Sequence, residues 1–527
     1  MIIGIDFGTC FSSVTMMNGD APVSNLIHDP KRTGIPSVFM YSAARQKELY
    51  GYECISDAES LEHSKDVIQY LKRMVRENPD NLSKTVMSGG KAFEVRSILE
   101  KYLTYVIAEA ERAAEKSGEF PNPKIEEVVI TVPIGISSGQ MAATDYNQLL
   151  VDTIAKIRGL PKNKIHILHE PVAAAIAYLY QETIRAKFTK SETILVFDLG
   201  GGTLDVTIVE YNPNTQTYEI KVKEGDLRLG GNEWDEKLAA LLLRKAGISR
   251  FDYPEEEAFF RREVTELKCA LSERDRGWIT FKWNSEEEEV RCTRLEFENE
   301  TKELLDRAIA VTKKAIGNFL PGLSGIDKII LVGGSCNMPK IKRRLVEEFS
   351  LLGEEKILLY EPSYAISKGA GIYAKLIART RIAHGIMPQR IVKDIVTHTY
   401  GFNIFDEDRK ESMIYNLLFK GTPYGADGTI QVKSDTAFTP IEKKQQEIEF
   451  NVYESDAARK PGEDGNLMSL NIGEENGMKI TIPVPHKYRK NAREYAVYAT
   501  FRINNEILEL IITDNEGNQV GYDRKAL

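Results

Sequence analysis

Three consecutive glycines, Gly200–Gly202, lie in the segment FDLGGGTLDVTIV, with Asp198 before them and Asp205 after them. Glycine weakens a strand, so three glycines between two strand-like stretches indicate a turn with a specific use. A glycine-rich hairpin exposes successive backbone N–H groups, which form an anion-binding site with no side chains in the way. Carboxylates beside such a turn hold Mg²⁺ through its water molecules. The segment therefore predicts a site for phosphate and magnesium.

A second segment near the start of the chain repeats this pattern. The segments IIGIDFGTCFSSVTMM and ILVFDLGGGTLDVTIV each contain an apolar strand, Asp-x-Gly, a short turn of small residues and an alternating strand. Asp6 and Gly8 thereby match Asp198 and Gly200. The long separation is typical of a duplicated half-domain and not of a solenoid repeat. Two such hairpins that face each other would clamp a polyphosphate from both sides.

A third glycine pair, Gly333-Gly334 followed by Ser335, lies at a strand-to-helix junction, where backbone approaches a nucleoside closely. We expect the hydroxyls of Thr9 and Thr203 to bind terminal phosphate oxygens. The alternative is that these are ordinary turns, because glycine and aspartate are the commonest turn formers. The repeat and the third element favour the phosphate site. The sequence contains neither G-x-x-x-x-G-K-[ST] nor G-x-G-x-x-G, the commoner nucleotide fingerprints.

Alternating strands and helices must position these turns. We expect strands at EEVVITVP and KIILVGGS, and helices at VRSILEKYLTYVIAEAERAAEK, PVAAAIAYLYQE and MPKIKRRLVEEF. This succession predicts an α/β architecture in two halves over residues 1–378. Residues 379–395 have little periodicity and are expected to be a linker. Short alternating segments over residues 396–527, such as EIEFNVYES, predict an all-β module that we interpret as a sandwich.

Composition and charge narrow the classes of partner. The 527-residue chain has 42% hydrophobic and 28% charged residues, as soluble globular proteins do, and is long enough for several domains. Its net charge of −9 argues against nucleic acid or an anionic membrane as the main partner. The 5 cysteines lack a C-x-x-C spacing, which argues against a zinc site and favours the cytoplasm. We expect no transmembrane helix and no signal peptide.

Taken together, the ordered motifs resemble the heat-shock-protein-70 chaperone family, in its DnaK-like form. Its two phosphate loops are similar to GIDFGTCFSSV and FDLGGGTLDVTIV, and its connecting segments to VVITVPIGISSGQMAAT and ILHEPVAAAIAYL. Further nucleotide-site segments are similar to EGDLRLGGNEWDEKL and ILVGGSCNMPKIKRRL. The resemblance covers nearly the whole chain. It implies a two-lobed actin-like ATPase domain that binds Mg²⁺ with ATP or ADP and hydrolyses ATP slowly, followed by a β-sandwich that binds extended apolar polypeptide.

The resemblance also implies roles for single residues. Lys72 matches the lysine that positions the attacking water and the γ-phosphate, and Glu170 matches the carboxylate near that water. Taken alone, Lys72 would be a solvated helix lysine and Glu170 a first-turn helix charge. The implied catalytic residues are Lys72, Glu170, Asp198 and Thr203, and the implied metal residues, acting mainly through water, are Asp6, Asp198 and Asp205. The implied nucleotide contacts are Gly8, Thr9, Cys10, Phe11, Gly200, Gly201, Gly202, Thr203, Gly230, Gly231, Lys268, Cys269, Ser272, Gly333, Gly334, Ser335 and Asn337.

The chain departs from the family pattern on the adenine side and in the segments that couple the domains. Cys269 and Asn337 stand where the family usually presents arginines around the adenine. Because an arginine stacked on an aromatic ring contributes about 0.5–2 kcal/mol, we expect weaker adenine affinity than the family norm. Met141 replaces an arginine, and Arg390 and Lys393 interrupt the apolar linker. We therefore expect peptide to stimulate ATP hydrolysis only weakly.

The β module carries the peptide site that the resemblance implies. Met413, Phe438, Ile448 and Phe450 fall near the family's apolar peptide pocket, and a role in the sandwich core is an equal alternative. The sequence ends at GYDRKAL without a segment like the family's helical lid, so we expect a short form whose peptide complexes exchange fast. The partners implied are unfolded polypeptide clients, a J-domain co-chaperone and a nucleotide exchange factor.

Two other functions remain open at this point. A nucleotide-gated interaction protein, with little hydrolysis and one dedicated partner, is favoured by the departures on the adenine side and in the linker. A small-molecule kinase of the same superfamily would share the two phosphate loops. The β module and the lack of a recognisable substrate loop count against the kinase.

Overall fold

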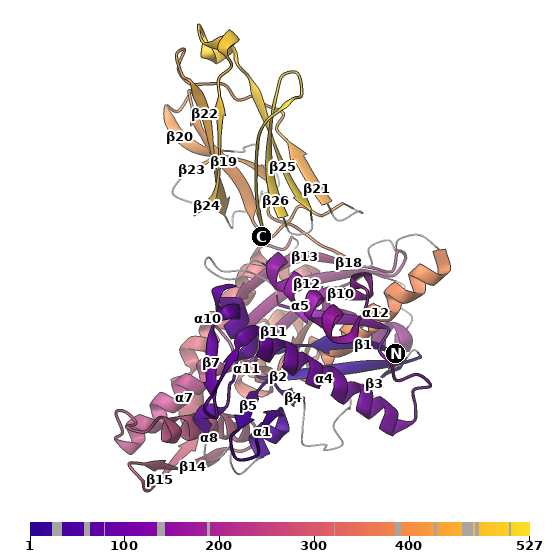
Figure 1. The fold of residues 1–527 in the computed structure, drawn as a ribbon, viewed down its shortest axis with the longest axis vertical. Coiled ribbons are helices and arrows are strands. Elements are labelled where there is room, and N and C mark those ends of the chain that lie inside the picture. Colours follow the sequence, from indigo (N-terminus) through magenta and orange to yellow (C-terminus); the bar gives the residue numbers. More distant parts are fainter. Residues whose placement is uncertain are drawn as a thin grey trace. The chain divides into compact units, whose positions relative to one another are not determined.

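The computed structural model describes most of the chain and divides it into two compact units. The described residues are 1–19, 21–23, 34–56, 64–77, 79–133, 143–186, 190–320, 322–384, 392–425, 429–455, 467–469, 474–504 and 507–526. One unit comprises residues 1–141, 146–218 and 223–388, and the other comprises 142–145, 219–222 and 389–527. The first unit contains helices and strands, whereas the C-terminal part of the second is built of strands and short turns (Figure 1).

The first half of the α/β unit is built on a sheet of order β10-β9-β1-β2-β3. Strand β1 (Ile2–Asp6) pairs antiparallel with β2 (Phe11–Asn18) and parallel with β9 (Glu127–Val132). Strand β10 (Ile165–His169) runs parallel to β9, and β3 (Ala21–Val23) lies beyond β2. Every residue of β9 is buried, which is typical of a parallel strand with both faces covered.

The second half repeats this arrangement with the order β17-β16-β11-β12-β13. Strands β11 (Glu192–Leu199) and β12 (Leu204–Asn212) form an antiparallel hairpin that corresponds to β1 and β2. Strand β16 (Lys328–Val332) is parallel to β11, and β17 (Ile357–Leu359) is parallel to β16. Strand β13 (Thr217–Asp226) follows β12. Strands β10, β9, β1 and β2 of the first sheet and β17, β16, β11 and β12 of the second have the same order and directions, in agreement with the repeated sequence pattern.

Helices cover these sheets and bury continuous apolar faces. Helix α4 (Val95–Ser117) buries Ile98, Tyr102 and Val106 among others, and it ends at Gly118, which has a left-handed φ of 68°. The helices expected from PVAAAIAYLYQE and MPKIKRRLVEEF are α6 and α11. The remaining long helices and their bounds are α5 (Ala143–Arg158), α6 (Glu170–Ala186), α7 (Gly231–Ala246), α8 (Pro254–Glu273), α10 (Lys302–Gly317), α11 (Pro339–Glu348) and α12 (Ala365–His384).

Shorter elements complete the α/β unit. Helix α3 carries Lys72, and strands β14 and β15 form a hairpin that packs on α8. Their bounds are α1 (Tyr52–Ser56), α3 (Leu71–Glu77), α9 (Arg294–Glu300), β4 (Ile35–Pro36), β5 (Phe39–Ser42), β6 (Lys47–Tyr50), β7 (Thr85–Ser88), β8 (Lys91–Glu94), β14 (Arg276–Trp283) and β15 (Glu286–Thr293).

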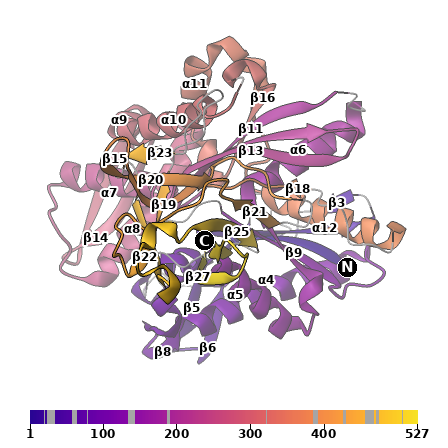
Figure 2. The same cartoon turned by 90° about the horizontal axis from the view of Figure 1, so that it is seen from above.

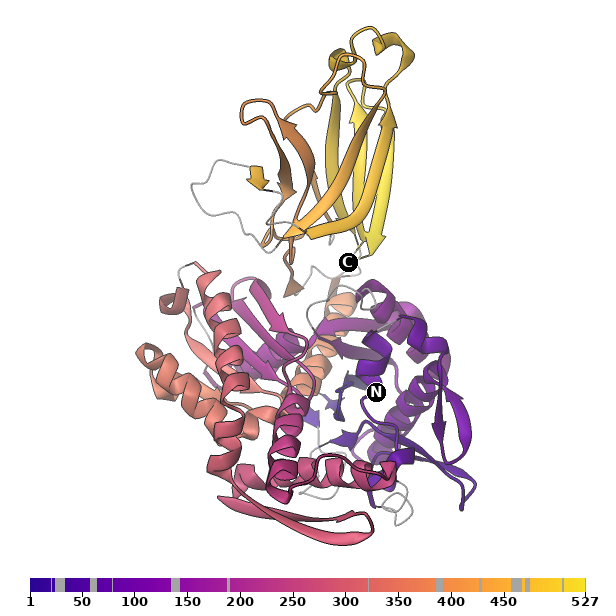
Figure 3. The same ribbon diagram turned by 90° about the vertical axis from the view of Figure 1, so that its left-hand side faces the viewer.

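The second unit contains two antiparallel sheets that share one hydrophobic core. Phe402 and Phe450 of one sheet and Phe501 and Leu510 of the other are fully buried in it. Figure 3 shows these strands in two layers. One sheet has the order β23-β20-β19-β22-β24 and the other β21-β25-β26-β27. The bounds are β19 (Thr399–Asp406), β20 (Glu411–Leu418), β21 (Thr429–Lys433), β22 (Glu447–Ser455), β23 (Leu467–Ser469), β24 (Glu474–Pro483), β25 (Val497–Asn504), β26 (Ile507–Asp514) and β27 (Gln519–Ala526).

The region expected to be a linker, residues 379–395, is partly helical. Helix α12 continues to His384, because the run ARTRIAH supplies good helix formers and no proline or glycine before Gly385. Lys393 lies in the short strand β18 (Val392–Lys393). Arg390 and Met141 lie outside the described residues, so the expectations placed on them stay predictions. No helix within the described ranges is long and apolar enough to cross a membrane.

Helix α12 packs closely against α6 and against the first sheet. Figure 2 shows α12 beside β9 and β3. Gly369 of α12 lies directly against the backbone of Ala173 in α6, where a Cβ would overlap the Ala173 carbonyl oxygen. Backbone does not yield as a flexible side chain does, so only glycine allows this approach.

We predict that Gly369→Ala destabilises the α/β unit, because the added methyl forces α6 and α12 apart. Overpacking of this kind costs about 1–3 kcal/mol, and the melting temperature followed by circular dichroism should fall by several degrees. Gly317→Ala is the matched control, because a Cβ at that helical glycine of α10 meets no atom within 4 Å. A melting temperature for Gly369→Ala equal to that of Gly317→Ala would contradict the prediction.

Candidate active site

The turn between β1 and β2 and the turn between β11 and β12 lie against each other. A Cβ at Gly201 would lie 2.5 Å from Cys10 Sγ, and a Cβ at Gly202 would lie 3.2 Å from Thr9 Oγ1. Neither glycine has a positive φ, so these glycines make room for the side chains of the first turn and do not serve an unusual backbone conformation. The two hairpin turns therefore face each other, as their repeated pattern predicts.

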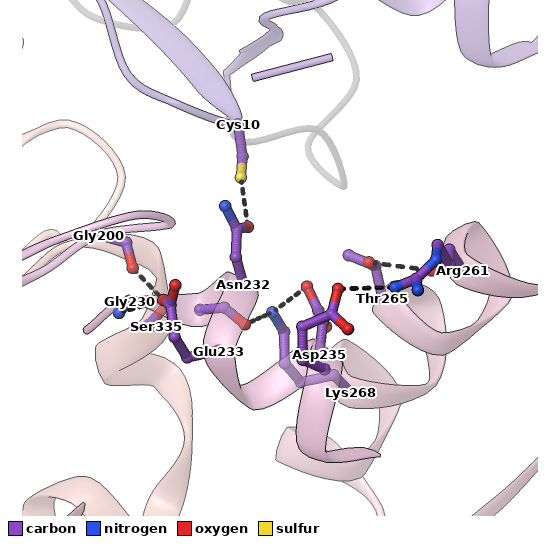
Figure 4. Close-up of polar contacts among 12 residues, drawn as sticks. Cys10, Gly200, Gly230, Asn232, Glu233, Asp235, Arg261, Thr265, Lys268 and Ser335 are labelled. Carbon is purple, nitrogen blue, oxygen red and sulfur yellow. Dashed lines mark hydrogen bonds and ion pairs between the residues drawn. The ribbon is translucent and has the colours of Figure 1, made fainter. Parts of the chain in front are cut away.

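The second turn is fixed from its other side by the start of α7 and by Ser335. The amides of Gly231 and Asn232 donate to the carbonyls of Gly200 and Gly201 at 3.0 and 2.8 Å. Ser335 Oγ donates to the Gly200 carbonyl at 2.8 Å (Figure 4). Because these carbonyls are bound on one side, the conformation of the turn is set before any ligand enters.

Gly230 and Gly333 bring two further backbone segments to the same turn. A Cβ at Gly230 would lie 2.5 Å from the backbone of Gly202, and the Gly230 amide donates to Glu233 Oε2 at 2.8 Å. Gly333 ends β16 with a φ of 84°, and a Cβ there would lie 2.7 Å from Asp198 Oδ1. The predicted glycine residues of four separate segments thus converge on one place in the α/β unit.

A small pocket opens beside the two turns. Its lining combines the hydroxyls of both turns with four cationic side chains. The lining residues are Thr9, Lys72, Arg73, Arg76, Gly202, Thr203, Leu227 and Arg228. Such a lining suits a polyanion, because hydroxyls, backbone amides and fixed cations all stabilise phosphate oxygens.

Sequence analysis missed Arg73, Arg76, Leu227 and Arg228 as pocket residues. A signal existed for two of them, because the run LKRMVRE places arginines one and four positions after Lys72 on a short helix. For Arg228 the signal was weaker: a cation two positions before a Gly-Gly pair in a segment that resembles a nucleotide motif. Their common position around one pocket depends on tertiary structure.

Lys72 of α3 and Glu170 at the start of α6 form a buried ion pair. Lys72 Nζ lies 2.5 Å from Glu170 Oε1, and the two side chains are 6% and 8% exposed. Burial by itself would lower the pKa of the Lys72 amine, but the negative charges of Glu170 and Asp6 and the Tyr146 ring oxygen outweigh it and raise the pKa. Lys72 is therefore not a solvated helix lysine, and its charge is held at the edge of the pocket.

Three aspartates lie behind the turns. Asp198 and Asp205 are opposite each other in the β11–β12 pairing, and Asp6 accepts a hydrogen bond from Thr131 Oγ1 at 3.3 Å. Burial, and then the charge of Glu170, raises the pKa of both Asp6 and Asp205 to about 7. The same causes raise the pKa of Asp198 well above its ordinary value.

The aspartates fit a hydrated cation better than a cage of direct ligands. Asp205 Oδ1 is buried and has no hydrogen-bond partner within the described part of the chain, which leaves an acceptor for a cation or one of its waters. The described residues contain no group of three His, Cys, Asp or Glu side chains placed to ligate a metal directly. Magnesium keeps several waters in most protein sites, so this donor set suits it.

Lys268 of α8 binds the first turn of α7. Its Nζ donates to the Gly231 carbonyl at 2.8 Å and lies 2.9 Å from Asp235 Oδ2 (Figure 4). Ser272, one turn later on α8, donates from Oγ to the Lys268 carbonyl at 3.3 Å. The charge of Lys268 is therefore already neutralised by Asp235.

Cys269 and Asn337 are both exposed, at the positions where arginines were expected to surround the base. Asn337 Nδ2 donates to the carbonyl of Gly334 at 2.9 Å. Neither side chain presents a cation or a planar guanidinium. These two positions therefore lack the arginines that the family usually presents there.

Comparison with known proteins places the chain in a family. The family model described as Hsp70 protein matches residues 2–468. The chain belongs to the Hsp70 family. Its relatives include the chaperone protein DnaK of Mycoplasmopsis agalactiae, 28% identical over 472 residues that cover 86% of this chain and 69% of DnaK. The chaperone protein HscA of Buchnera aphidicola is 24% identical over 467 residues, 86% of this chain and 83% of HscA.

A plant protein is also similar to this chain. The chloroplastic stromal 70 kDa heat shock-related protein of Pisum sativum is 27% identical over 403 residues, which cover 72% of this chain and 53% of the plant protein. Bacterial and chloroplast relatives share the family but differ in compartment. The comparisons therefore fix the family and leave the location of this Hsp70 chain open.

Cys10 and Phe11, which follow Thr9 in the first turn, were also expected to contact the nucleotide. Cys10 Sγ donates to Asn232 Oδ1 at 3.5 Å, and burial raises the pKa of the thiol to about 11 (Figure 4). The thiol is therefore protonated at neutral pH. Phe11, the first residue of β2, is 48% exposed. Gly8 lies between them and the strand β1, with its carbonyl bound by Ser37 Oγ at 2.8 Å.

The residues expected near the peptide pocket of this Hsp70 chain are largely buried in the second unit. Ile448 and Phe450 belong to its hydrophobic core, and Phe438 packs on that core with its ring 4.9 Å from the ring of Phe402. Met413 is 4% exposed. These contacts agree with the alternative of a core role, and a peptide-binding role stays a prediction.

We predict that Asp205→Asn stabilises the ligand-free protein at pH 8. The pKa of Asp205 is raised from 3.8 to about 7, so its protonated form favours the fold. That contribution is complete below pH 3.8 and is lost as pH rises through 7. The melting temperature of Asp205→Asn should exceed that of the wild type at pH 8, and the difference should shrink toward pH 5.

The matched control for this comparison is Asp252→Asn, an exposed aspartate that pairs with Arg250 at 3.3 Å. It should show no such trend with pH. If Asp205→Asn melts at or below the wild-type temperature at pH 8, the carboxylate is not destabilising in the ligand-free fold.

Proposed function

We propose how this Hsp70-type chaperone works. It binds Mg²⁺ with ATP in the pocket beside the two hairpin turns, hydrolyses ATP slowly, and binds extended apolar polypeptide on its β module. The observation that supports nucleotide binding most directly is the convergence of two glycine turns, the Gly230 segment and four cationic side chains on one pocket. Membership of the Hsp70 family supports the pairing of this site with a β module.

The proposal includes the organisation of the chain. Residues 1–378 form a two-lobed, actin-like nucleotide-binding domain, residues 379–395 form the interdomain linker, and residues 396–527 form the substrate-binding sandwich. Two sheets with equal strand order support the duplicated lobes. One core shared by two antiparallel sheets supports the sandwich.

Each side chain has a proposed role in hydrolysis. A water oxygen forms a bond to the γ-phosphorus, the bond to the β–γ bridging oxygen breaks, and ADP, phosphate and one proton are released. Lys72, fixed by Glu170, positions the water and the γ-phosphate, and Thr9 and Thr203 bind phosphate oxygens. Asp6, Asp198 and Asp205 hold the waters of Mg²⁺, which neutralises phosphate charge when it is bound. Most of the acceleration comes from positioning and charge stabilisation.

The partners proposed are unfolded or extended polypeptides, a J-domain co-chaperone and a nucleotide exchange factor. A second candidate is a nucleotide-gated interaction protein with little hydrolysis and one dedicated partner. The exposed Cys269 and Asn337 and the neutralised Lys268 favour it, because they leave the nucleoside few charged contacts.

We predict that Lys72→Met lowers the single-turnover rate of Mg²⁺·ATP hydrolysis by about 10²-fold and changes the dissociation constant of ATP by less than threefold. The reason is that Lys72 acts on the reacting phosphate and water, whereas most phosphate contacts remain. Equal rates for mutant and wild type would remove Lys72 from the mechanism. No measurable hydrolysis by the wild type would favour the dedicated-partner function.

Two controls accompany this measurement. Loss of one partner of a buried ion pair costs about 3–5 kcal/mol, so Lys72→Met/Glu170→Gln shows whether a charge left unpaired has damaged the fold. Lys302→Met changes an exposed lysine of α10 that pairs with Asp306 and should hydrolyse ATP at the wild-type rate. Adding an unfolded polypeptide to the same assay separates a general chaperone from a protein with one partner.

We also predict weak binding of the adenine. Two missing arginines remove roughly 1–4 kcal/mol, so the dissociation constants of ATP and ADP should be micromolar or weaker in calorimetry. The double substitution Cys269→Arg/Asn337→Arg should lower the dissociation constants of ATP and ADP about tenfold or more. A sub-micromolar dissociation constant for the wild type would show that other contacts replace the arginines.

A further inference from the structure

In the loop between β13 and α7, hydrogen bonds and packing fix the backbone on both sides of Arg228. The Arg228 amide donates to Asp226 Oδ1 at 3.0 Å, and Arg307 of α10 donates to Asp226 Oδ2 at 2.6 Å and to the Arg228 carbonyl at 3.5 Å. On the other side Leu229 is fully buried and Gly230 packs on the backbone of Gly202. The backbone at Arg228 is therefore held in place, whereas its side chain is exposed.

Arg228 lines the pocket together with both phosphate turns. The same cavity wall contains Thr9 of the first turn, Thr203 of the second turn and Lys72. A guanidinium that lines the same pocket as these groups can reach a phosphate that they bind.

The cations of the pocket differ in how much of their charge is compensated. Lys72 is paired with Glu170 at 2.5 Å, and Arg73 lies 3.5 Å from Glu233. The Arg76 guanidinium lies 5.7 Å from the centroid of the Tyr146 ring. No ion pair or side-chain hydrogen bond of Arg228 occurs among the residues that the structure describes. Its positive charge is the one that a ligand phosphate would compensate.

We propose that Arg228 is an arginine supplied within the chain that binds the terminal phosphate of ATP and stabilises its transfer to water. This inference rests on the proposed function of the site and adds a catalytic residue to it. As the bond from the γ-phosphorus to the bridging oxygen breaks, negative charge spreads over the phosphate oxygens, and a planar guanidinium donates two hydrogen bonds to them. Arginines in this role accelerate phosphoryl transfer in other nucleotide hydrolases.

Arg228 should therefore distinguish ATP from ADP. ADP lacks the phosphate that the guanidinium contacts, so its affinity depends on the hairpin turns and the nucleoside side alone. A residue that only raised the general positive potential of the pocket would affect both nucleotides.

The experiment compares wild type, Arg228→Ala and Arg228→Lys by calorimetry with ATP and ADP and by single-turnover hydrolysis. We expect Arg228→Ala to weaken ATP about tenfold, to leave ADP within twofold, and to slow hydrolysis at least tenfold. The ATP affinity and hydrolysis rate of Arg228→Lys should lie between those of the wild type and Arg228→Ala. Lysine keeps the positive charge but cannot donate the paired hydrogen bonds of a planar guanidinium. Arg250→Ala, at an arginine 82% exposed and paired with Asp252, is the matched control and should equal the wild type.

The outcomes separate this inference from the proposed function. If the wild type binds ATP and Arg228→Ala binds it equally well, the inference is wrong and the nucleotide site stands. If Arg228→Ala weakens ATP and ADP equally, the residue supplies only general potential and the inference is wrong. If the wild type binds neither nucleotide, the proposed function and the inference both fail. A wild type that binds ATP without hydrolysing it still tests the inference through the ATP and ADP affinities.

Discussion

The close approach of backbone segments at the second glycine turn is the constraint on which the rest of the site depends. Gly201 and Gly202 leave room for the side chains of Cys10 and Thr9 in the first turn, and Gly230, at the start of α7, leaves room for the backbone of Gly202. A side chain at Gly230 would force the start of α7 away from the second turn, because the atoms it would meet belong to backbone. The pocket exists because four segments meet without side chains between them, and the sheets below fix where each segment ends.

Charge balance is the second consequence of this packing. The turns bring Asp6, Asp198 and Asp205 together with Glu170 in a buried region, where the charge of Lys72, and at Asp205 also that of Arg76, offsets them only in part. Burial and mutual repulsion hold protons on the aspartates when no ligand is bound. A cation bound here would compete with those protons, so protonation would oppose metal binding, whereas phosphate would favour it.

Much of this arrangement could be predicted from sequence, because glycine turns and strand periodicity are local signals. The repeated Asp-x-Gly pattern correctly indicated two equivalent hairpins, and the alternating segments after residue 396 indicated an all-β module. Residues 379–395 were expected to be a linker with little periodicity, but α12 extends to His384 because the residues before Gly385 favour a helix. Arg73 and Arg228 were missed as pocket residues, since their shared wall depends on how α3 and the β13–α7 loop pack and not on any spacing.

In the proposed nucleotide site, the contacts would be unevenly divided between the two ends of the nucleotide. At the phosphate end, two turns, two hydroxyls and four cations surround one pocket. At the nucleoside end, Lys268 is neutralised by Asp235, and Cys269 and Asn337 offer neither charge nor a stacking plane. Binding free energy that the base does not supply must come from the phosphates. Loss of the terminal phosphate would therefore remove a larger share of the total binding free energy than it would in a site that also held the base tightly. We therefore expect the affinity of such a site to differ more between ATP and ADP than between nucleotides with different bases.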